Sequence, residues 1–189
     1  MNARVLALLL VAIVAGSLDA LAEPACKTTQ LKNAAPTLAE MYALADGHAK
    51  AWKADAIPVR INNSTLGLLQ PNGSAASWNL MFYSDSAKSS ISIDTFRGSL
   101  TCTSSPGSAG RIPDFKPDFV RDGAKLYALA KQHGEALLKE GYGVTIGTAA
   151  APSNRHATWN INYTKDGARD GDITVLVDAN TGVVEKVLK

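Results

Sequence analysis

The sequence has few of the residues from which catalytic and metal centres are usually built. It contains three histidines and two cysteines among 189 residues. It lacks the motifs of a nucleophile elbow, a phosphate-binding loop, a dinucleotide-binding turn and a zinc-protease helix. It also lacks an excess of charge, because 19 Lys and Arg are interspersed with 17 Asp and Glu, which disfavours nucleic-acid binding. We therefore predict no catalytic residues, no cofactor, no bound metal and no nucleic-acid partner.

Long apolar runs are absent except for one near the N-terminus. Residues 5–16 (VLALLLVAIVAG) follow Arg4, and a small-x-small sequence (ALA) ends at Ala22. This order predicts a signal peptide over residues 1–22, cleaved before Glu23, with an uncleaved anchor as the alternative. The run is shorter than the ~20 residues that a membrane-spanning helix needs. We expect a periplasmic or secreted protein that is not inserted in the membrane after cleavage.

Three sequence blocks occur twice in the same order. The block at 42–48 (YALADGH) recurs at 127–133 (YALAKQH), the block at 76–83 (ASWNLMFY) recurs at 157–164 (ATWNINYT), and the block at 93–98 (IDTFRG) recurs at 177–182 (VDANTG). The offsets of 85, 81 and 84 residues differ only by small loop changes. Repeated blocks at a nearly constant offset indicate an internal duplication.

Each copy is predicted to begin with a helix and to continue as short antiparallel strands. In the first copy, Thr37 and Glu40 form the Thr-x-x-Glu pattern of a capping box, which starts a helix. The second helix is expected to begin near Asp118, after Pro117, and to end at Gly141. Apolar and polar residues alternate in the segments after each helix, which is typical of half-buried strands.

These patterns predict an α+β fold of two tandem cystatin-like units. In each unit, one helix would pack on a three- to four-stranded antiparallel sheet. The first unit is expected to cover residues 23–103 and the second residues 117–189. The stretch 104–116, which begins with Ser, Pro and Gly residues, is expected to be a linker.

The two cysteines, Cys26 and Cys102, are predicted to form one disulfide, since an exported chain enters an oxidising compartment. The bond would join the start of the mature chain to the last strand of the first unit. Closing a loop of about 77 residues stabilises a fold by about 4 kcal/mol in the chain-entropy model. A redox role is disfavoured, because neither cysteine lies in a Cys-x-x-Cys sequence or beside a histidine.

Two sets of residues are singled out by the repeats. The candidate binding residues are the aromatic residues Trp78, Tyr83, Trp159 and Tyr163. The tryptophans are expected to be core anchors first, and ligand contacts only if their indoles lie on an exposed face. The second set is expected to form structural hairpins, because Asp accepts hydrogen bonds from the amides that follow it and Gly tolerates a positive φ. Its members are Asp94, Gly98, Asp178 and Gly182.

The remaining candidates for chemistry are three histidines and one acidic segment. His48 and His133 occupy equivalent helix positions, where a bridging metal is an alternative to a structural role, but no Cys, Asp or Glu lies at ligand spacing around either. His156 is expected to be exposed. The acidic segment 166–172 lacks the regular Asp spacing and distal Glu of a calcium loop, so a solvated hairpin is favoured over a calcium site.

The second copy resembles the PepSY domain. The resemblance rests on residues 159–163 (WNINY) and 173–184 (ITVLVDANTGVV), which include a V-D-A-x-T-G-x-V hairpin. It covers roughly residues 118–188, and the first copy matches less closely, because its hairpin keeps the Asp and Gly but not the Ala and Thr. The resemblance implies an exported helix-on-sheet module without catalytic residues. Such modules are associated with binding or restraining peptidases and with sensing or accessory roles at the cell envelope.

We therefore expect an exported, non-catalytic protein- or peptide-binding module, acting as a peptidase inhibitor or as an envelope accessory or sensor protein. Its partner in the cell envelope would bind at a strand edge or on an exposed sheet face. The loops 62–65 and 149–154 are secondary candidates. The alternative is a periplasmic carrier that holds a small apolar ligand between helix and sheet. A hydrolase is the third alternative, with no residue to assign to its chemistry.

Overall fold

The computed structural model describes residues 26–107, 112–150, 156–166 and 172–189. The expected signal peptide and its cleavage site lie outside these residues, as do parts of the loop 149–154 and of the acidic segment 166–172. Within the described residues, no helix is both long enough and apolar enough to cross a membrane.

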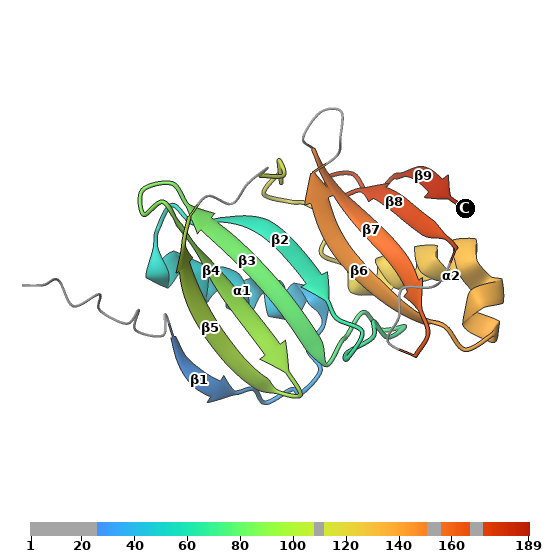
Figure 1. Ribbon diagram of the computed structural model, residues 1–189, viewed down its shortest axis with the longest axis horizontal. Helices are drawn as coiled ribbons and strands as arrows, with labels where there is room; N and C mark the ends of the chain where they lie inside the picture. The colour runs from blue at the N-terminus through green and yellow to red at the C-terminus, as the bar shows by residue number, and fades with distance from the viewer. Residues whose placement is uncertain (1–25, 108–111, 151–155, 167–171) are drawn as a thin grey trace, which may run out of the picture.

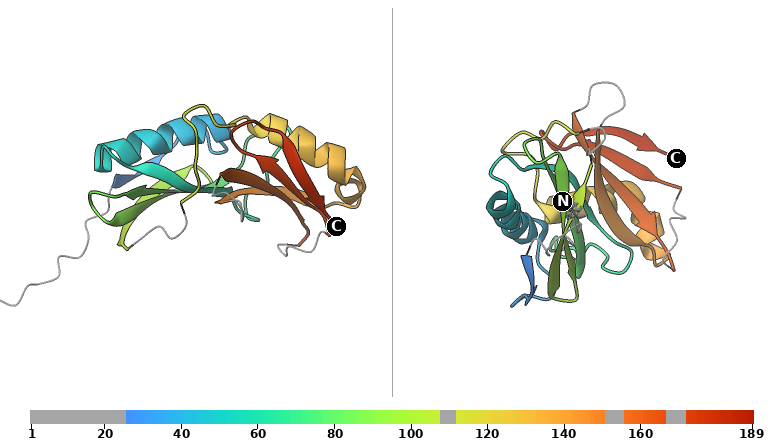
Figure 2. Two further views of the ribbon diagram at one scale, coloured as in Figure 1. Left: turned by 90° about the horizontal axis from the view of Figure 1, so that it is seen from above. Right: turned by 60° about the vertical axis from the view of Figure 1, so that its left-hand side comes forward.

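Nine strands form one antiparallel sheet, in the order β1-β5-β4-β3-β2-β6-β7-β8-β9 (Figure 1). The strands are β1 (Cys26–Gln30), β2 (Ile57–Asn63), β3 (Ser77–Ser84), β4 (Ser89–Phe96), β5 (Ser99–Pro106), β6 (Gly143–Ala150), β7 (Ala157–Thr164), β8 (Thr174–Asp178) and β9 (Val184–Leu188). Two helices, α1 (Leu38–Trp52) and α2 (Gly123–Lys139), lie on the same side of the sheet (Figure 2). No helix or strand of the described chain covers the opposite side, which we call the open face.

The prediction of two cystatin-like units is wrong, because the sheets of the two halves join through β2 and β6. Each of these strands would be an edge of its own half, and an unpaired edge exposes a row of backbone N–H and C=O groups. Here the two edges pair with each other, so the sheet continues from β1 to β9. The molecule is therefore one nine-stranded sheet with two helices, rather than two small sheets with one helix each.

The junction between β2 and β6 is built from equivalent residues of the two copies. Asn62 pairs with Gly147 in the antiparallel register. These residues are 85 positions apart, the offset that also relates the repeated helical blocks. The first copy therefore pairs with its own counterpart, as in the self-complementary interface of a twofold-symmetric dimer.

Two hydrogen bonds to side chains flank this pair. The amide of Ile61 donates to Thr148 Oγ1 at 2.8 Å, and the amide of Ile146 donates to Asn63 Oδ1 at 2.6 Å. Ile61 and Ile146 are counterparts, as are Asn63 and Thr148, so one pseudo-twofold axis relates both bonds. Asn63 is buried and donates to the Gly67 carbonyl at 2.8 Å, which fixes its orientation. These bonds satisfy amides that would otherwise remain unpaired at a buried junction.

The first helix begins at the predicted capping box. The amide of Thr37 donates to Glu40 Oε2 at 2.8 Å, and the amide of Glu40 donates to Thr37 Oγ1 at 3.3 Å. The hydrogen bond from the Thr37 amide lowers the pKa of the Glu40 carboxyl. One face of α1 is buried against the sheet and consists of Leu38, Met41, Tyr42, Ala45 and Ala49.

The second helix begins later than the sequence predicts. Asp122, not Asp118, is the N-cap, and the helix starts at Gly123. The amide of Val120 donates to the carbonyl of Ala179 at 2.7 Å. This bond holds the segment before α2 against the end of β8, so these residues are not available to a helix.

The two tryptophans occupy matching positions in the core between helices and sheet, and both are buried. Each indole N–H donates to a carbonyl that shortly precedes the helix of its own half. The acceptors are Pro36 for Trp78 and Val120 for Trp159, each at 2.9 Å. The duplicated sequence therefore gives duplicated packing.

The predicted disulfide is confirmed. Cys26 and Cys102 are bonded and face each other in the register of β1 and β5. The bond fastens β1 to the outer side of β5. Strand β5 continues to Pro106, into the stretch that the sequence assigns to a linker.

Candidate functional site

The four aromatic residues predicted as binding residues are buried. Their exposed fractions are 1% for Trp78, 7% for Tyr83 and 0% for Trp159 and Tyr163. The Tyr163 hydroxyl donates to the Ala130 carbonyl in α2, and burial raises the pKa of Tyr163 to about 12. The side chains of Trp78, Trp159 and Tyr163 lie in the interior between helices and sheet, and Tyr83 lies on the opposite side of the sheet but is 7% exposed. Most surface contacts must therefore come from other residues.

The second hairpin has the structural role that the sequence predicts. Asp178 Oδ1 accepts hydrogen bonds from the amides of Asn180 at 2.7 Å and Thr181 at 3.2 Å. Gly182 has a φ of 74°, which glycine adopts without steric cost. The turn is therefore held by its first residue and completed by its glycine.

The first hairpin differs from this pattern at Asp94. Arg97 and Gly98 have φ values of 48° and 85°, as in a tight two-residue turn. Asp94 lies inside β4, before the turn, and accepts hydrogen bonds from Asn79 and Ser92. The loop after β4 is shorter than the loop after β8, so the matching Asp residues of the two copies have different roles.

The open face is covered mainly with Ser, Thr and Asn side chains. Successive residues of a strand point to opposite faces, so the register identifies the members. The first half contributes Arg60, Asn62, Ser77, Asn79, Met81, Tyr83, Ser90, Ser92, Asp94, Phe96, Ser99, Thr101, Thr103 and Ser105. The second half contributes Gly143, Thr145, Gly147, Ala149, Thr158, Asn160, Asn162, Thr164, Thr174, Leu176, Asp178, Lys186 and Leu188.

Hydrogen bonds along the open face orient several of these side chains. Asn79 Nδ2 donates to Ser92 Oγ at 2.8 Å and also to Asp94, and Ser92 Oγ donates to Asp94 Oδ2 at 2.9 Å. In the second half, Thr174 Oγ1 donates to Asn162 Oδ1 at 3.1 Å. The face is therefore an ordered array of donors and acceptors.

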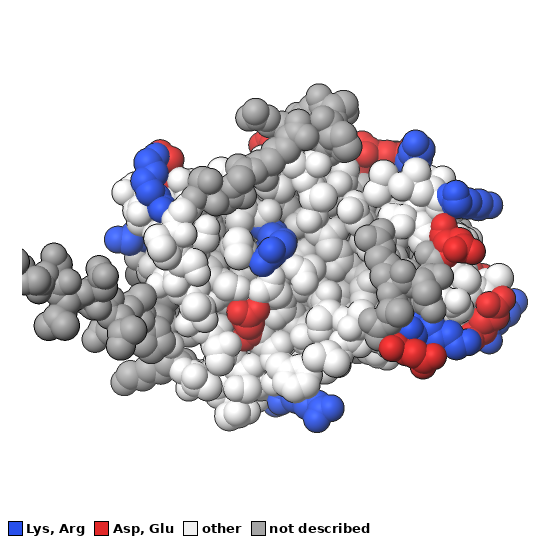
Figure 3. Space-filling model, in the orientation of Figure 1, with Lys and Arg blue, Asp and Glu red and all other residues white. Residues whose placement is uncertain are grey.

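The open face has little charge. Among β2 to β9, the register places four charged residues there, which are Arg60, Asp94, Asp178 and Lys186. Figure 3 looks onto this face and shows small, separate basic and acidic areas within a broad uncharged surface. The sheet arches beneath the helices, with the open face on the inner side of the arch (Figure 2). Hydrogen bonding and shape, rather than charge, would decide what binds there.

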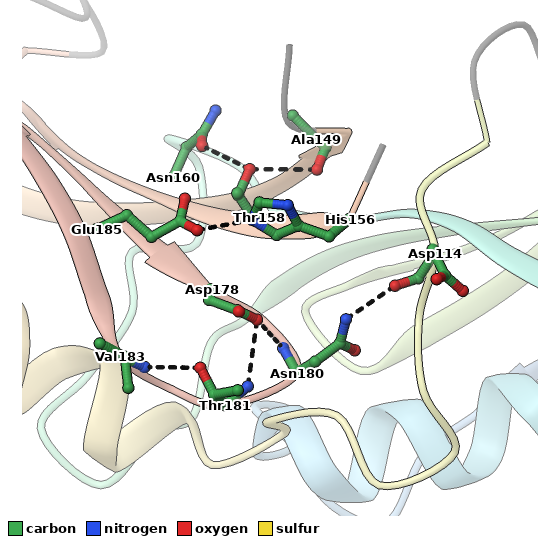
Figure 4. Close-up of polar contacts among 10 residues, drawn as sticks. All are labelled: Asp114, Ala149, His156, Thr158, Asn160, Asp178, Asn180, Thr181, Val183 and Glu185. Carbon is green, nitrogen blue, oxygen red and sulfur yellow. Dashed lines mark hydrogen bonds and ion pairs between the residues drawn. The ribbon is translucent and has the colours of Figure 1, made fainter. Parts of the chain in front are cut away.

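A group of polar residues that includes Asp178 of the open face lies near the β9 edge of the sheet (Figure 4). His156 Nε2 lies 2.7 Å from Glu185 Oε1, and one ligand atom each from His156, Asp178 and Glu185 lie within 4.8 Å of one another. The expectation that His156 is exposed is wrong, because its side chain is only 20% exposed beside Glu185.

Sequence reasoning missed this group because its members come from three separate segments of the chain. His156 precedes β7, Asp178 ends β8, and Glu185 lies in β9. A register irregularity opposite Leu176 and Val177 makes Glu185 an extra residue in β9. No spacing along the chain indicates such a contact.

The disulfide also has a histidine beside it. The sulfur atoms of Cys26 and Cys102 and a ring nitrogen of His48 lie within 4.8 Å of one another. No histidine lies next to either cysteine in the sequence, but His48 lies next to both of them in the folded protein. While the sulfurs are bonded to each other they are not the thiolates that metals bind. His133, the counterpart of His48, belongs to neither group of three potential ligands found in the described residues.

Comparison with known proteins adds no function to this geometry. No protein-family model, no curated protein and no solved structure matches the chain. The resemblance to the PepSY domain therefore rests on the residues that suggested it.

Proposed function

We propose that the protein is a non-catalytic binding module that holds a protein or peptide partner on the open face of its sheet. The observation that supports this proposal is the contrast between the two sides of the sheet. Both helices cover one side, and the other side is left uncovered by helices across nine strands. Antiparallel sheets commonly present one face to solvent, so the character of that face decides what it binds.

The open face is large enough for a protein partner. Nine strands spaced about 4.8 Å apart give a sheet about 38 Å wide. Strands of five to eight residues are about 17–27 Å long. The product, on the order of 800 Å², equals what each partner contributes to a standard protein interface. A small ligand would instead need a concave pocket.

The side chains of the open face suit a protein surface. Ser, Thr and Asn offer both donors and acceptors, and short side chains lose little conformational entropy when they become ordered. The centres of protein interfaces are depleted of charged residues, as this face is. Met81 and Leu176 add half-buried apolar surface, and Phe96 is 42% exposed. Polar and apolar contacts are thus both available to a partner.

The carrier alternative has less support. The space between helices and sheet is filled by large buried side chains, among them Trp78, Trp159 and Tyr163. A cavity of about 530 Å³ lies on the outer side of α2, beside Pro71, rather than between helix and sheet. No observation among the described residues favours an internal ligand.

We further propose that this binding takes place outside the cytoplasm. The Cys26–Cys102 disulfide supports an oxidising compartment. The resemblance to the PepSY domain supports the restraint of a peptidase, or an accessory or sensing role at the cell envelope, as the purpose of binding.

The proposal is tested by adding a long charged side chain to the open face. Residues 23–189 serve as bait in an envelope extract, alongside the variants Asn79→Arg, Thr145→Arg and Gln132→Arg. Asn79 and Thr145 are half-buried on the open face, whereas Gln132 is exposed on α2 and receives the same change in charge. Captured proteins are identified by mass spectrometry, and their affinities are then measured with purified components.

We expect both open-face variants to bind the captured partner at least about tenfold more weakly, which corresponds to ~1.4 kcal/mol. Gln132→Arg should bind like the wild type. Circular dichroism and thermal unfolding of each variant show whether the fold is kept. The proposal is contradicted if no protein is captured reproducibly, or if Gln132→Arg weakens binding as much as the open-face variants.

A further inference from the structure

We propose that His156, Asp178 and Glu185 form a zinc-binding site near the β9 edge of the sheet. His156 immediately precedes β7, Asp178 ends β8 and Glu185 lies in β9, and their ligand atoms lie close to one another (Figure 4). The site shares Asp178 with the open face, but zinc binding needs one ion and no protein partner, so it can be measured on the isolated protein. Its test is therefore independent of the test of partner binding.

The three ligand atoms are close to the arrangement that Zn²⁺ requires. Zinc binds His nitrogen and carboxylate oxygen at about 2.0–2.2 Å in tetrahedral geometry, which places neighbouring ligand atoms about 3.4 Å apart. His156 Nε2 and Glu185 Oε1 are now 2.7 Å apart, and all three ligand atoms lie within 4.8 Å of one another. Movements of about 1 Å therefore suffice to place all three around one ion.

The surrounding hydrogen bonds hold two of the ligands in position. Asp178 Oδ1 accepts from the amides of Asn180 and Thr181, which orients the carboxylate and leaves Oδ2 for an ion. Asn180 in turn donates to the Asp114 carbonyl at 2.9 Å. Asp114 forms a backbone bridge with His156, so the same segment also fixes the histidine. Outer contacts of this kind orient metal ligands and raise metal affinity.

The donor set selects the class of ion. Ca²⁺ and Mg²⁺ prefer sites made of oxygen alone, whereas imidazole favours zinc and the neighbouring transition metals. The side chains of His156 and Glu185 are 20% and 34% exposed, so an ion can reach them from solvent. Three protein ligands leave a fourth tetrahedral position for water or for a ligand from outside, as in open zinc sites.

Calorimetric titration of the oxidised mature protein with Zn²⁺, and in separate runs with Ca²⁺ and Mg²⁺, tests the site. We expect one Zn²⁺ per chain at this site and no comparable binding of the other two ions. Asp178→Asn and Glu185→Gln keep the shape of the side chain and remove one charged ligand each, and His156→Gln removes the nitrogen ligand. Each should weaken Zn²⁺ binding at least about tenfold. The matched control, His133→Gln on α2, should bind Zn²⁺ like the wild type.

Two further measurements keep the test decisive. Thermal unfolding without metal shows which variants fold, and X-ray absorption of the zinc-bound wild type should report one imidazole and carboxylate oxygens around the ion. The proposal is overturned if Zn²⁺ does not bind, or if the spectrum contains no imidazole. It is also overturned if the folded site variants bind Zn²⁺ as tightly as the wild type. The three residues would then serve only to join β7 to β9 through the His156–Glu185 pair.

Discussion

The two halves of the molecule fill the space between helix and sheet with different residues. The first half has Phe82 and Ala49 where the second half has Tyr163 and Gly134. The Tyr163 hydroxyl donates to the Ala130 carbonyl in α2, and a Cβ added at Gly134 would lie 2.2 Å from Cζ of the Tyr163 ring. In the second half, the larger aromatic residue is accommodated because the helix above it has no side chain at the point of contact.

The second helix is distorted at the position where Gly134 takes the place of Ala49. Gly134 has a φ of −134° and a ψ of 32°, outside the helical range, in the middle of α2. Ala49, the counterpart in α1, is a buried member of a helix that keeps its stripe of apolar residues. The kink in α2 thus lies where the tyrosine ring meets the backbone.

The outer edges of the two halves also differ. Strand β1 is joined to β5 by a disulfide, whereas β9 is joined to β8 by backbone pairing and to the start of β7 by the His156–Glu185 pair. A covalent bond limits the unfolded chain, while a hydrogen-bonded pair acts only in the folded state. The two edges should therefore respond differently to the same treatments.

Of the changes proposed here, removal of the disulfide should lower the free energy of unfolding most. We expect Cys26→Ala combined with Cys102→Ala to lower the free energy of unfolding by about 4 kcal/mol, because a loop of about 77 residues is no longer closed in the unfolded chain. Urea denaturation measures the loss, and amide hydrogen exchange locates it. Amides that exchange by global unfolding should exchange faster throughout the sheet, and those of β1 and β5 should be accelerated further by local opening. An increase in β9 equal to that in β1 would contradict the independence of the two edges.

Gly134→Ala should cause the next largest loss in the free energy of unfolding. The added methyl group meets the Tyr163 ring, so we expect a loss of about 3 kcal/mol in the free energy of unfolding. Gly47→Ala in α1 is the matched control, since a Cβ there meets nothing within 4 Å. The control should stabilise the protein by about 0.5–1 kcal/mol. Similar effects of the two substitutions on the urea midpoint would refute the proposed contact.

The double variant Gly134→Ala, Tyr163→Phe recreates the pair of the first half in the second. Without its hydroxyl the ring is no longer held to the Ala130 carbonyl and can move away from the new methyl group. We expect the double variant to be about 1 kcal/mol more stable than the sum of the single effects predicts. Equilibrium unfolding of all four proteins measures this coupling, and strict additivity would show that the two positions do not depend on each other.

The smallest effect on stability should come from the ionisation of Tyr163 at high pH. Burial raises the pKa of Tyr163 to about 12, above its ordinary value of 10.0. The unfolded chain therefore ionises first, and the stabilising contribution is complete below about pH 10 and lost as the pH rises toward 12. Unfolding at about pH 9 and about pH 11 should show a steeper loss of stability for the wild type than for Tyr163→Phe. Parallel losses would mean that Tyr163 ionises as freely when folded as when unfolded.

Local features of the fold could be predicted from the sequence because each depends on a few neighbouring residues. The Thr37–Glu40 capping box, the turn at Asp178 and Gly182, and the duplication itself are of this kind. The disulfide was predicted from composition, since only two cysteines are available. Burial of the tryptophans, too, agrees with the expectation that they are core anchors.

Features that depend on contacts between distant segments could not be predicted. The joining of β2 to β6 depends on Asn63 and Thr148, whose side chains accept backbone hydrogen bonds and leave no hydrophobic pattern. The late start of α2 depends on the bond between Val120 and Ala179. The contact between His156 and Glu185 requires an irregular residue in β9.

The open face is a single surface only if the sheet is continuous across the two copies. Amide hydrogen exchange at Ile61 and Ile146 tests this continuity most directly. Both amides donate to side chains across the junction, so both should exchange as slowly as amides in the middle of β3. Thr148→Val should accelerate exchange at Ile61 while Ile146 stays protected. Exchange of both wild-type amides at the rate of exposed strand edges would contradict a single sheet and would divide the open face into two unrelated surfaces.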